Sequence, residues 1–516
     1  MPTDLNVKPY TNKQLLLFPA SIGDYLSEDD LAHVVDEAVE EIDLSAYCRK
    51  IPSVGNPSYH PALMIKLWFY GYATGTCSSR KIEEKLHKDI AFIYLASMQK
   101  PDFKAISEFR RKNIYELKDS FVDILQICHR LGLTKLGEIS IDSKIIKANA
   151  SISRTYGEEK LSREEKEVEA AIKEYLEKAG QADIEEDREY GADGRENELP
   201  KGIHGKEERI KRLREIAKEL KQIRKKLEIR KSINLTDMDA GVQKDKSRKV
   251  AGYRSQVAVD SKQQIIIANN VTSKSVDTQE LLPMAGQAVE NIKRLKSLEA
   301  KKDNKEERIR LLADSGYSSG ENLAELDKKG GIDPYIPDMR YQGKERGRKT
   351  DEENEFHSSK FSYHKKGNYC VCPEGKRLSP SGIMRHHNKE YLLYKASNCK
   401  KCKYFQDCAN GRKSKYIWVS KDRHFVEKMR QKLSTEKGRK IYRRRKITAE
   451  PVLGNLSQNL GFREFLLRGI EKVRGEYSLM CTAHNILKIM KFLKQQGIRL
   501  KEALAMPRPL VALNTS

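Results

Sequence analysis

The stretch from Glu138 to Pro337 constrains the fold most, because its apolar residues change repeatedly between the spacing of a strand and that of a helix. It opens with EISIDSKIIKA, in which Ile139 and Ile141 share one face of a strand. YRSQVAVDSKQQIIIANNV reads as a hairpin turning near Asp260, and a helix, the strand RIRLLA, the helix GENLAELDKKG and the strand IDPYIP follow. This order predicts an α/β fold with a mixed sheet flanked by helices.

Two aspartates stand in or directly after predicted strands of this sheet. Asp142 lies in the first strand and Asp314 follows RIRLLA, and α/β sheets commonly place their functional sites at such positions. If the two strands are neighbours, the carboxylates converge and repel each other unless a divalent cation such as Mg²⁺ lies between them. The alternative is structural, because an aspartate after a strand often caps the next helix.

Glu450 is the candidate for a third acid. It lies in YRRRKITAEPVLGN, after a run of cations, and an exposed ion pair alone would contribute only about 0–1 kcal/mol. We expect Thr448 to cap a helix whose first turn holds Glu450 and Pro451. Three carboxylates would complete a two-metal site for an in-line phosphoryl displacement. Glu464 and Glu471 are the other glutamates considered for this place.

The charge of the chain points to a polyanionic partner. Lys and Arg number 98 against 74 Asp and Glu, which leaves a formal net charge of +24. Residues 1–120 read as short helices, and FKAISEFRRKN offers Lys104, Arg110 and Arg111 to DNA if this bundle contains a helix-turn-helix. An ordinary helical bundle with solvated charges is the alternative.

Membrane partners are not expected. No apolar run reaches the roughly 18–20 residues that a spanning helix needs. The N-terminus does not resemble a secretory signal, because its apolar stretch is short and an acid stands early in it. We therefore expect a cytoplasmic, nucleoid-associated protein.

Residues 157–232 are almost free of aromatic residues and dense in Glu, Lys and Arg. Their apolar side chains nevertheless step by three and four, as in a heptad seam: Leu213, Ile216, Leu220, Ile223 and Leu227. A shorter stripe precedes it, so two helices could pair as a hairpin arm. A solvated charged spacer is the alternative, and no chemistry is assigned to the segment.

Cysteines predict a second site, since five of nine fall between Cys370 and Cys408. In a reducing compartment such clustering favours zinc over disulfides. Tetrahedral zinc takes four thiolates, and Cys399 with Cys402 supplies the common two-residue spacing. Cys372 and Cys408 would complete the set, with Cys370 as the spare that could replace Cys372. Buried or free thiols are the alternative to this structural zinc ribbon.

Several blocks together resemble the bacterial insertion-sequence transposases of the DDE class. The blocks are IDSKIIKANAS, GYRSQVAVD, LLADSGYSSGENL and YRRRKITAEPVLGNLSQNLGFREFLLRGIEKVRGEY, and residues 60–113 resemble the accompanying N-terminal domain. The resemblance implies a ribonuclease-H-like core with Asp142, Asp314 and Glu450 as the DDE acids. It also implies two Mg²⁺ or Mn²⁺ ions per active site.

The family signature around the glutamate also contains a tyrosine, an arginine and a lysine. Tyr442 and Arg445 match the first two, which implies contacts with DNA, and Lys446 is a further DNA-contact candidate. The lysine expected seven positions after the glutamate is Ser457 in this chain. Lys446 or Lys472 is the candidate to replace it.

Five parts are therefore expected. They are an N-terminal helical DNA-binding domain (1–130), a ribonuclease-H-like core (131–155 and 233–339), a charged helical arm (156–232), a zinc-ribbon-like insertion (340–420) and a basic segment with the glutamate helix and C-terminal helices that complete the core (421–516).

The expected activity is that of a transposase, which binds the terminal inverted repeats of its element, cuts, and joins the ends to target DNA, as a homodimer on double-stranded DNA. A nuclease with the same core but no strand transfer, and a non-catalytic DNA-binding descendant of a transposase, are the alternatives.

Overall fold

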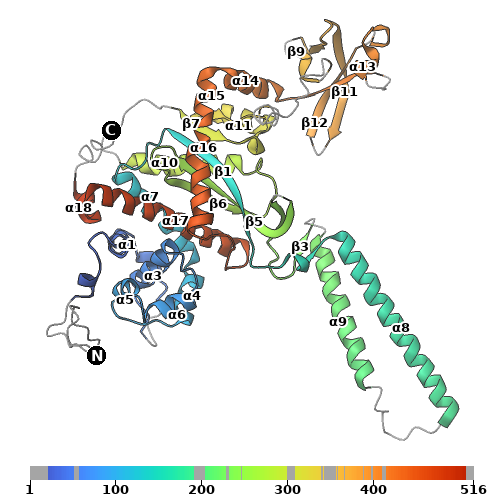
Figure 1. Cartoon of the computed structure of the whole chain (residues 1–516). Coiled ribbons are helices and arrows are strands. Elements are labelled where there is room, and N and C mark those ends of the chain that lie inside the picture. The colour runs from blue at the N-terminus through green and yellow to red at the C-terminus, as the bar shows by residue number, and fades with distance from the viewer. Residues whose placement is uncertain are drawn as a thin grey trace, which may run out of the picture. The chain divides into compact units, whose positions relative to one another are not determined.

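The computed structural model describes residues 21–51, 57–190, 204–227, 232–245, 247–298, 308–338, 341, 356, 358–364, 367–386, 389–396, 399–409 and 414–506 (Figure 1). The chain divides into two compact units. The first takes its residues from Met1–Leu131 and Thr482–Ser516, and the second is Gly132–Cys481. Among the described residues, no helix is both long and apolar enough to cross a membrane.

The first unit is helical, as predicted. It contains α1 (Leu31–Glu40), α2 (Ser45–Cys48), α3 (Pro61–Ala73), α4 (Ser79–Lys85), α5 (Ile90–Leu95), α6 (Phe103–Lys112), α7 (Ile114–Arg130) and α18 (Leu500–Ala505). Helix α3 is apolar nearly all round and buries Trp68, Phe69 and Tyr72, so it forms the centre of this unit. Asp102 caps α6 by accepting a hydrogen bond from the Ala105 N–H at 2.7 Å, as its place in the sequence predicts.

The end of the chain belongs to this first unit, whereas the sequence led us to place all of 421–516 with the core. The long helix α17 (Ile470–Gln496) passes from one unit into the other. Within the first unit, Arg499 pairs with the buried Glu37 at 2.6 Å, and the Lys501 N–H donates to the same carboxylate at 3.1 Å. Such contacts between the two ends of the chain leave no local signal in the sequence.

The second unit is built on a six-stranded mixed sheet, which confirms the predicted sheet flanked by helices. Its strands are β1 (Glu138–Lys147), β4 (Gly241–Asp245), β5 (Arg248–Asp260), β6 (Ile266–Thr272), β7 (Ile309–Ala313) and β8 (Ile332–Tyr335). The order is β4-β5-β1-β7-β8, with β6 also paired to β5. Strands β1 and β5 and strands β5 and β6 are antiparallel, whereas β1, β7 and β8 run parallel. Strand β4 was not predicted.

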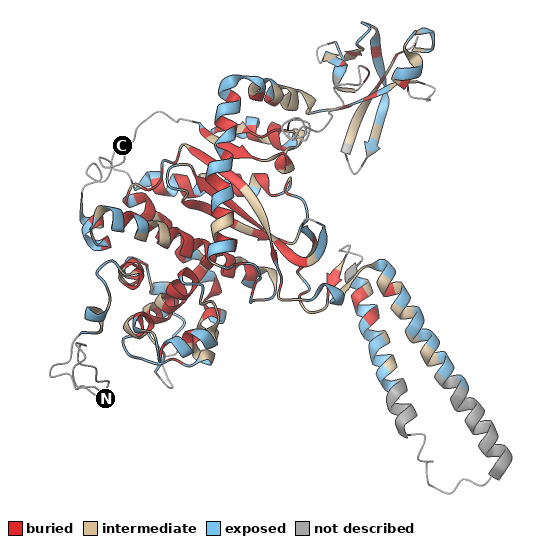
Figure 2. Cartoon of the chain, in the orientation of Figure 1, coloured by how far each residue is buried: buried red, intermediate tan, exposed pale blue. Residues whose placement is uncertain are grey.

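Helices cover this sheet. They are α10 (Leu281–Ser297), α11 (Gly320–Lys329), α14 (Arg423–Ser434), α15 (Glu436–Arg443) and α16 (Arg445–Gly454). Helix α10 packs on β5 and β6, and α16 packs on β1 and β5 and crosses β1 in Figure 1. Most residues of β5, β6 and β7 are buried, as is half of β1 (Figure 2). A site on β1 therefore lies under the glutamate helix.

Helix α16 begins earlier than the sequence led us to expect. It starts at Arg445, and Thr448 lies inside it, where its hydroxyl donates to the Arg444 carbonyl at 2.9 Å instead of capping. The prediction of a Thr448 cap is therefore wrong. Pro451 lies within the helix and has no N–H to offer the Ile447 carbonyl, and the Gln264 amide donates to that carbonyl at 2.8 Å.

Residues of the predicted arm form two paired helices, α8 (Glu158–Tyr190) and α9 (His204–Leu227). The short strands β2 (Thr155–Tyr156) and β3 (Ile233–Asn234), which pair with each other, precede α8 and follow α9 in the chain. The expected helical pairing is thus present. Among the described side chains of the predicted seam, Leu220 and Ile223 are buried, whereas Ile216 is exposed. Part of the predicted linker lies outside the described residues.

The cysteine-rich segment forms a second, antiparallel sheet in the order β13-β12-β11-β10-β9. Its strands are β9 (Ser362–His364), β10 (Tyr369–Val371), β11 (Arg377–His386), β12 (Lys389–Lys395) and β13 (Tyr416–Ser420), with the short helix α13 (Phe405–Ala409) between the last two. Phe361, Cys370 and Tyr394 are the centre of its small core. Cys370 is therefore a packing residue, in agreement with its place as the spare cysteine.

Candidate active site

Asp142 and Asp314 lie at corresponding positions of neighbouring parallel strands. The register pairs Ile141 of β1 with Ala313 of β7, so the aspartate that follows each of them comes to the same region of the sheet. Asp314 also caps the short 3-10 turn Ser315–Tyr317, because its Oδ1 accepts from the Gly316 N–H at 2.8 Å. Capping uses one oxygen of this carboxylate and is compatible with a second role.

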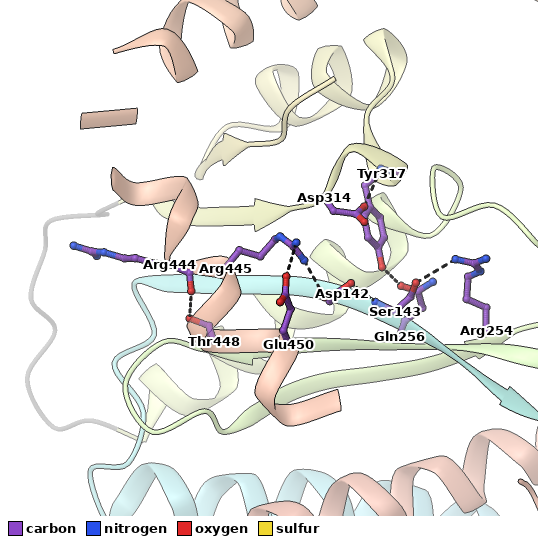
Figure 3. A network of polar contacts seen from close by, with 11 residues as sticks. Asp142, Ser143, Arg254, Gln256, Asp314, Tyr317, Arg444, Arg445, Thr448 and Glu450 are labelled. Atoms are coloured by element: carbon purple, nitrogen blue, oxygen red, sulfur yellow. Dashed lines mark hydrogen bonds and ion pairs between the residues drawn. The ribbon is translucent and has the colours of Figure 1, made fainter. Parts of the chain in front are cut away.

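Glu450 lies on helix α16, and Arg445 connects its carboxylate to that of Asp142. One guanidinium nitrogen, Nη1, donates to Asp142 Oδ2 at 2.9 Å, and the other, Nη2, donates to Glu450 Oε1 at 2.7 Å (Figure 3). The Arg445 side chain is only 9% exposed, whereas that of Glu450 is 47% exposed. Two of the three predicted acids are thus held by one buried cation.

Asp142 and Asp314 lie where burial penalises their charged forms. Burial raises the pKa of Asp142 to about 6, although Arg445 and the Ser143 N–H oppose the rise. Burial likewise raises the pKa of Asp314, again against the attraction of Arg445. No group of three or more His, Cys, Asp or Glu among the described residues is arranged to hold a metal ion. At this site the guanidinium lies between Asp142 and Glu450.

A buried polar network that the sequence did not reveal connects the segments that carry the two aspartates. Arg254 pairs with Asp277 at 2.6 Å and lies 3.4 Å from the Ser143 hydroxyl, next to Asp142. Gln256 donates to Asp277 at 2.8 Å and accepts from the Tyr317 hydroxyl, in the turn after Asp314. The spacing of these residues in the sequence does not identify them as neighbours of the site. Arg254 and Gln256 lie beside the Asp142 and Asp314 segments because strand β5 pairs with β1 (Figure 3).

A lysine from another part of the chain, Lys144, lies beside Ser457, the residue that replaces the lysine of the family signature. The Lys144 ammonium donates to the Ser457 hydroxyl and lies 3.5 Å from the Leu453 carbonyl oxygen. Lys446 and Lys472, the predicted replacements, are both exposed. Lys144 is two residues after Asp142 on the same face of β1, so strand alternation is the signal that could have identified it.

The predicted DNA contacts have different environments. Lys446 and Lys104 are exposed, and Arg111 pairs with Glu108 at the surface. Tyr442 is 3% exposed, and its ring meets Tyr341 edge-on.

Arg110 requires a correction. It is buried, its guanidinium stacks 4.1 Å from the centre of the Trp68 ring, and it donates to the Tyr72 hydroxyl at 3.0 Å. Arg110 therefore stabilises the core of the first unit and does not lie on a surface that DNA could reach.

The four cysteines of the predicted zinc site line one small cavity of about 30 Å³: Cys372, Cys399, Cys402 and Cys408. All four thiols are free and partly buried. Burial raises the pKa of Cys408, and the other three thiols add to that rise, as expected for sulfur atoms close together. The Lys376 N–H donates to Cys372 Sγ at 3.3 Å. Zinc itself stays a prediction, since the described residues show no metal-ligand arrangement.

Two sequence families match parts of the chain. A family described as a transposase DDE domain matches residues 371–490, which include the Glu450 helix. A family described as a transposase domain (DUF772) matches residues 20–112, which include α1 to α6. Among curated proteins and solved structures, no match was found.

The match to a transposase DDE domain, in a chain whose core is a mixed sheet, defines an enzyme of a phosphoryl-transfer family whose members bind DNA and use divalent metals. The particular member is a transposase with a DDE domain and an N-terminal transposase domain. The resemblance seen in the sequence is thereby confirmed.

Proposed function

We propose that this transposase binds the terminal inverted repeats of its own element, cleaves DNA at those ends and joins the resulting 3′-hydroxyl groups to target DNA. Asp142, Asp314 and Glu450 are its DDE acids, and the six-stranded sheet is a ribonuclease-H-like core. A homodimer would hold two ends at once. The observation that carries the proposal is the meeting of Asp142, Glu450 and a cation on β1, beside the strand end that carries Asp314.

The residues of this site suit divalent cations. Carboxylate oxygens are the ligands that Mg²⁺ and Mn²⁺ prefer, and the site already holds the cation of Arg445 between two of them. Bound metal would lower the pKa of the attacking water or 3′-hydroxyl and stabilise the leaving oxygen. The acids serve as ligands, so no covalent enzyme intermediate is required.

The exposed cations account for DNA affinity. Arg443, Lys446 and Lys104 are exposed, and each neutralised phosphate releases counterions from DNA. DNA binding should therefore weaken steeply as salt rises. Sequence preference for the repeats would come from base contacts, which phosphate contacts alone do not provide.

The first prediction separates a transposase from a nuclease. With a DNA carrying both ends of the element, a target plasmid and Mg²⁺, we expect cleaved ends and covalent joining of their 3′-hydroxyl groups to the plasmid. Sequencing of the products across the junctions measures joining. Cleavage without junctions would favour the nuclease alternative, and DNA binding without any cleavage would favour the non-catalytic one.

We also propose that Cys372, Cys399, Cys402 and Cys408 hold a structural Zn²⁺ as a zinc ribbon. The shared cavity supports this assignment, since thiolates drawn together around one ion avoid the repulsion they would otherwise have. The second sheet has a small core, so a metal would add to its stability.

The second prediction is about one zinc per chain in protein purified under reducing conditions, measured by elemental analysis. Cys402→Ser and Cys408→Ser should each lose most of this zinc, because three thiolates bind it more weakly than four. Cys48→Ser is the control, since Cys48 is exposed in the first unit. Freshly reduced wild-type protein without zinc would refute the assignment.

A further inference from the structure

Arg445 occupies the space between two of the acids to which the proposed function assigns metal. Its two terminal nitrogens each donate to a different carboxylate, at 2.9 Å and 2.7 Å. The third nitrogen, Nε, is buried and has no hydrogen-bond acceptor among the described residues. The guanidinium is therefore held between the acids by its charge and two hydrogen bonds, and its Nε–H is left without an acceptor in the described part of the chain.

The neighbouring Arg444 shows what an ordinary arginine of this segment does. It is exposed and pairs with the buried Glu138 at 3.0 Å, at the start of β1. Arg444 thus contacts a single acid that is not one of the three candidates. The bridge is specific to Arg445, although the two arginines are adjacent in sequence.

Electrostatics defines the consequence of this bridge. Carboxylates brought together without a cation repel each other, and the largely buried Asp142 also loses hydration, so Arg445 stabilises Asp142 and Glu450 in their converged positions. A divalent ion bound by these two carboxylates would stand within a few ångströms of the guanidinium, and charges of like sign repel strongly in a partly buried site. The guanidinium uses Asp142 Oδ2 and Glu450 Oε1, so a divalent ion held by this pair of carboxylates would compete with it for their charge and for these two oxygens.

We propose that Arg445 is a positioning residue that holds Asp142 and Glu450 together in the absence of metal and competes with the divalent cation for them. This inference rests on the proposed function. Metal binding then requires the guanidinium to leave at least one carboxylate, and the free protein binds metal more weakly than its acids alone would allow.

The test measures Mn²⁺ binding to the full chain without DNA, through the paramagnetic resonance signal of unbound Mn²⁺. Arg445→Gln keeps an amide donor and removes the charge, and Arg445→Ala removes the whole group. We expect both variants to bind Mn²⁺ about ten-fold more tightly than wild type, which corresponds to about 1.4 kcal/mol. Arg444→Ala is the matched control and should bind as wild type does.

Thermal unfolding provides a second readout that does not depend on activity. Without metal, Arg445→Ala should melt at a lower temperature than wild type, because its acids lack their cation, and Mn²⁺ should raise its melting temperature more than that of wild type. Variants that are unfolded in chelator should refold on addition of Mn²⁺. Failure of Mn²⁺ to restore the fold would contradict the inference.

The results distinguish this inference from the proposed function. If wild type binds Mn²⁺, and Arg445→Gln and Arg445→Ala bind it equally well or more weakly, then Arg445 does not compete with the metal. The assignment of a metal site to these acids would be unaffected by that result. If neither wild type nor the two variants bind Mn²⁺, the assignment of a metal site to these acids fails and the inference falls with it.

Discussion

Asp142→Asn and Asp314→Asn should each reduce Mg²⁺-dependent cleavage of DNA ends by about three orders of magnitude or more, while DNA affinity stays within a few-fold of wild type. Metal stabilisation of the transition state is worth several kcal/mol, and each 1.36 kcal/mol is about a factor of ten in rate. In the proposed function DNA affinity depends instead on the exposed cations, which neither substitution changes. Single-turnover cleavage and filter binding on one DNA measure the two quantities.

The conditions and controls of this experiment follow from the site. Burial raises the pKa of Asp142 to about 6, so an assay at about pH 8 keeps the wild-type carboxylate ionised and able to bind a cation. Asp277→Asn is a useful comparison, because Asp277 is a buried acid of the adjacent network and pairs with Arg254 rather than Arg445. If Asp142→Asn keeps the wild-type melting temperature and still cleaves DNA, then Asp142 is not a catalytic acid. The same test applies to Asp314→Asn.

Glu450→Gln should have a comparably large effect on cleavage and little effect on DNA binding. The substitution removes the charge with little change of shape, and the side chain is 47% exposed, so the fold should tolerate it. The loss follows from weaker metal binding, because an amide oxygen is a poorer ligand than a carboxylate. We expect higher Mn²⁺ concentrations to restore part of the activity, which a purely structural defect would not show.

Two other glutamates provide matched controls for Glu450→Gln. Glu471 lies in the first turn of α17 and pairs with Arg474 at 2.7 Å, and Glu464 is exposed in a loop beside Lys147 of β1. Neither makes a contact with Arg445 in the described structure. Glu464→Gln and Glu471→Gln should therefore cleave DNA as wild type does. Normal cleavage by Glu450→Gln, with loss of cleavage in one of these two, would show that the third acid was chosen wrongly.

The sequence by itself determined the elements of the core and the residues that could carry chemistry. Apolar spacing fixes β1, the β5–β6 hairpin, α10, β7 and α11, because burial of one face of a strand or helix imposes its period on nearby residues. The order of these elements predicted a mixed sheet with helices. The quoted motifs indicated the transposase family, which the two family matches confirm.

Only the tertiary structure decided which partner each charged side chain has. Arg110 and Lys104 look alike in FKAISEFRRKN, yet Arg110 is buried on Trp68 and Lys104 is exposed. Arg444 and Arg445 are adjacent, and a helical turn of about 100° between successive residues sends one to Glu138 and the other to Asp142 and Glu450.

Contacts between residues far apart in the sequence also explain the other differences between the predicted and the observed structure. Lys144 meets Ser457 across 313 positions of sequence, and Asp277 joins the two aspartate segments through residues of β5. The C-terminal residues after Cys481 group with the N-terminal helices in the same way. Local spacing records which face of an element is buried, whereas a contact between distant residues depends on how whole elements pack, and that packing is set by the complete chain.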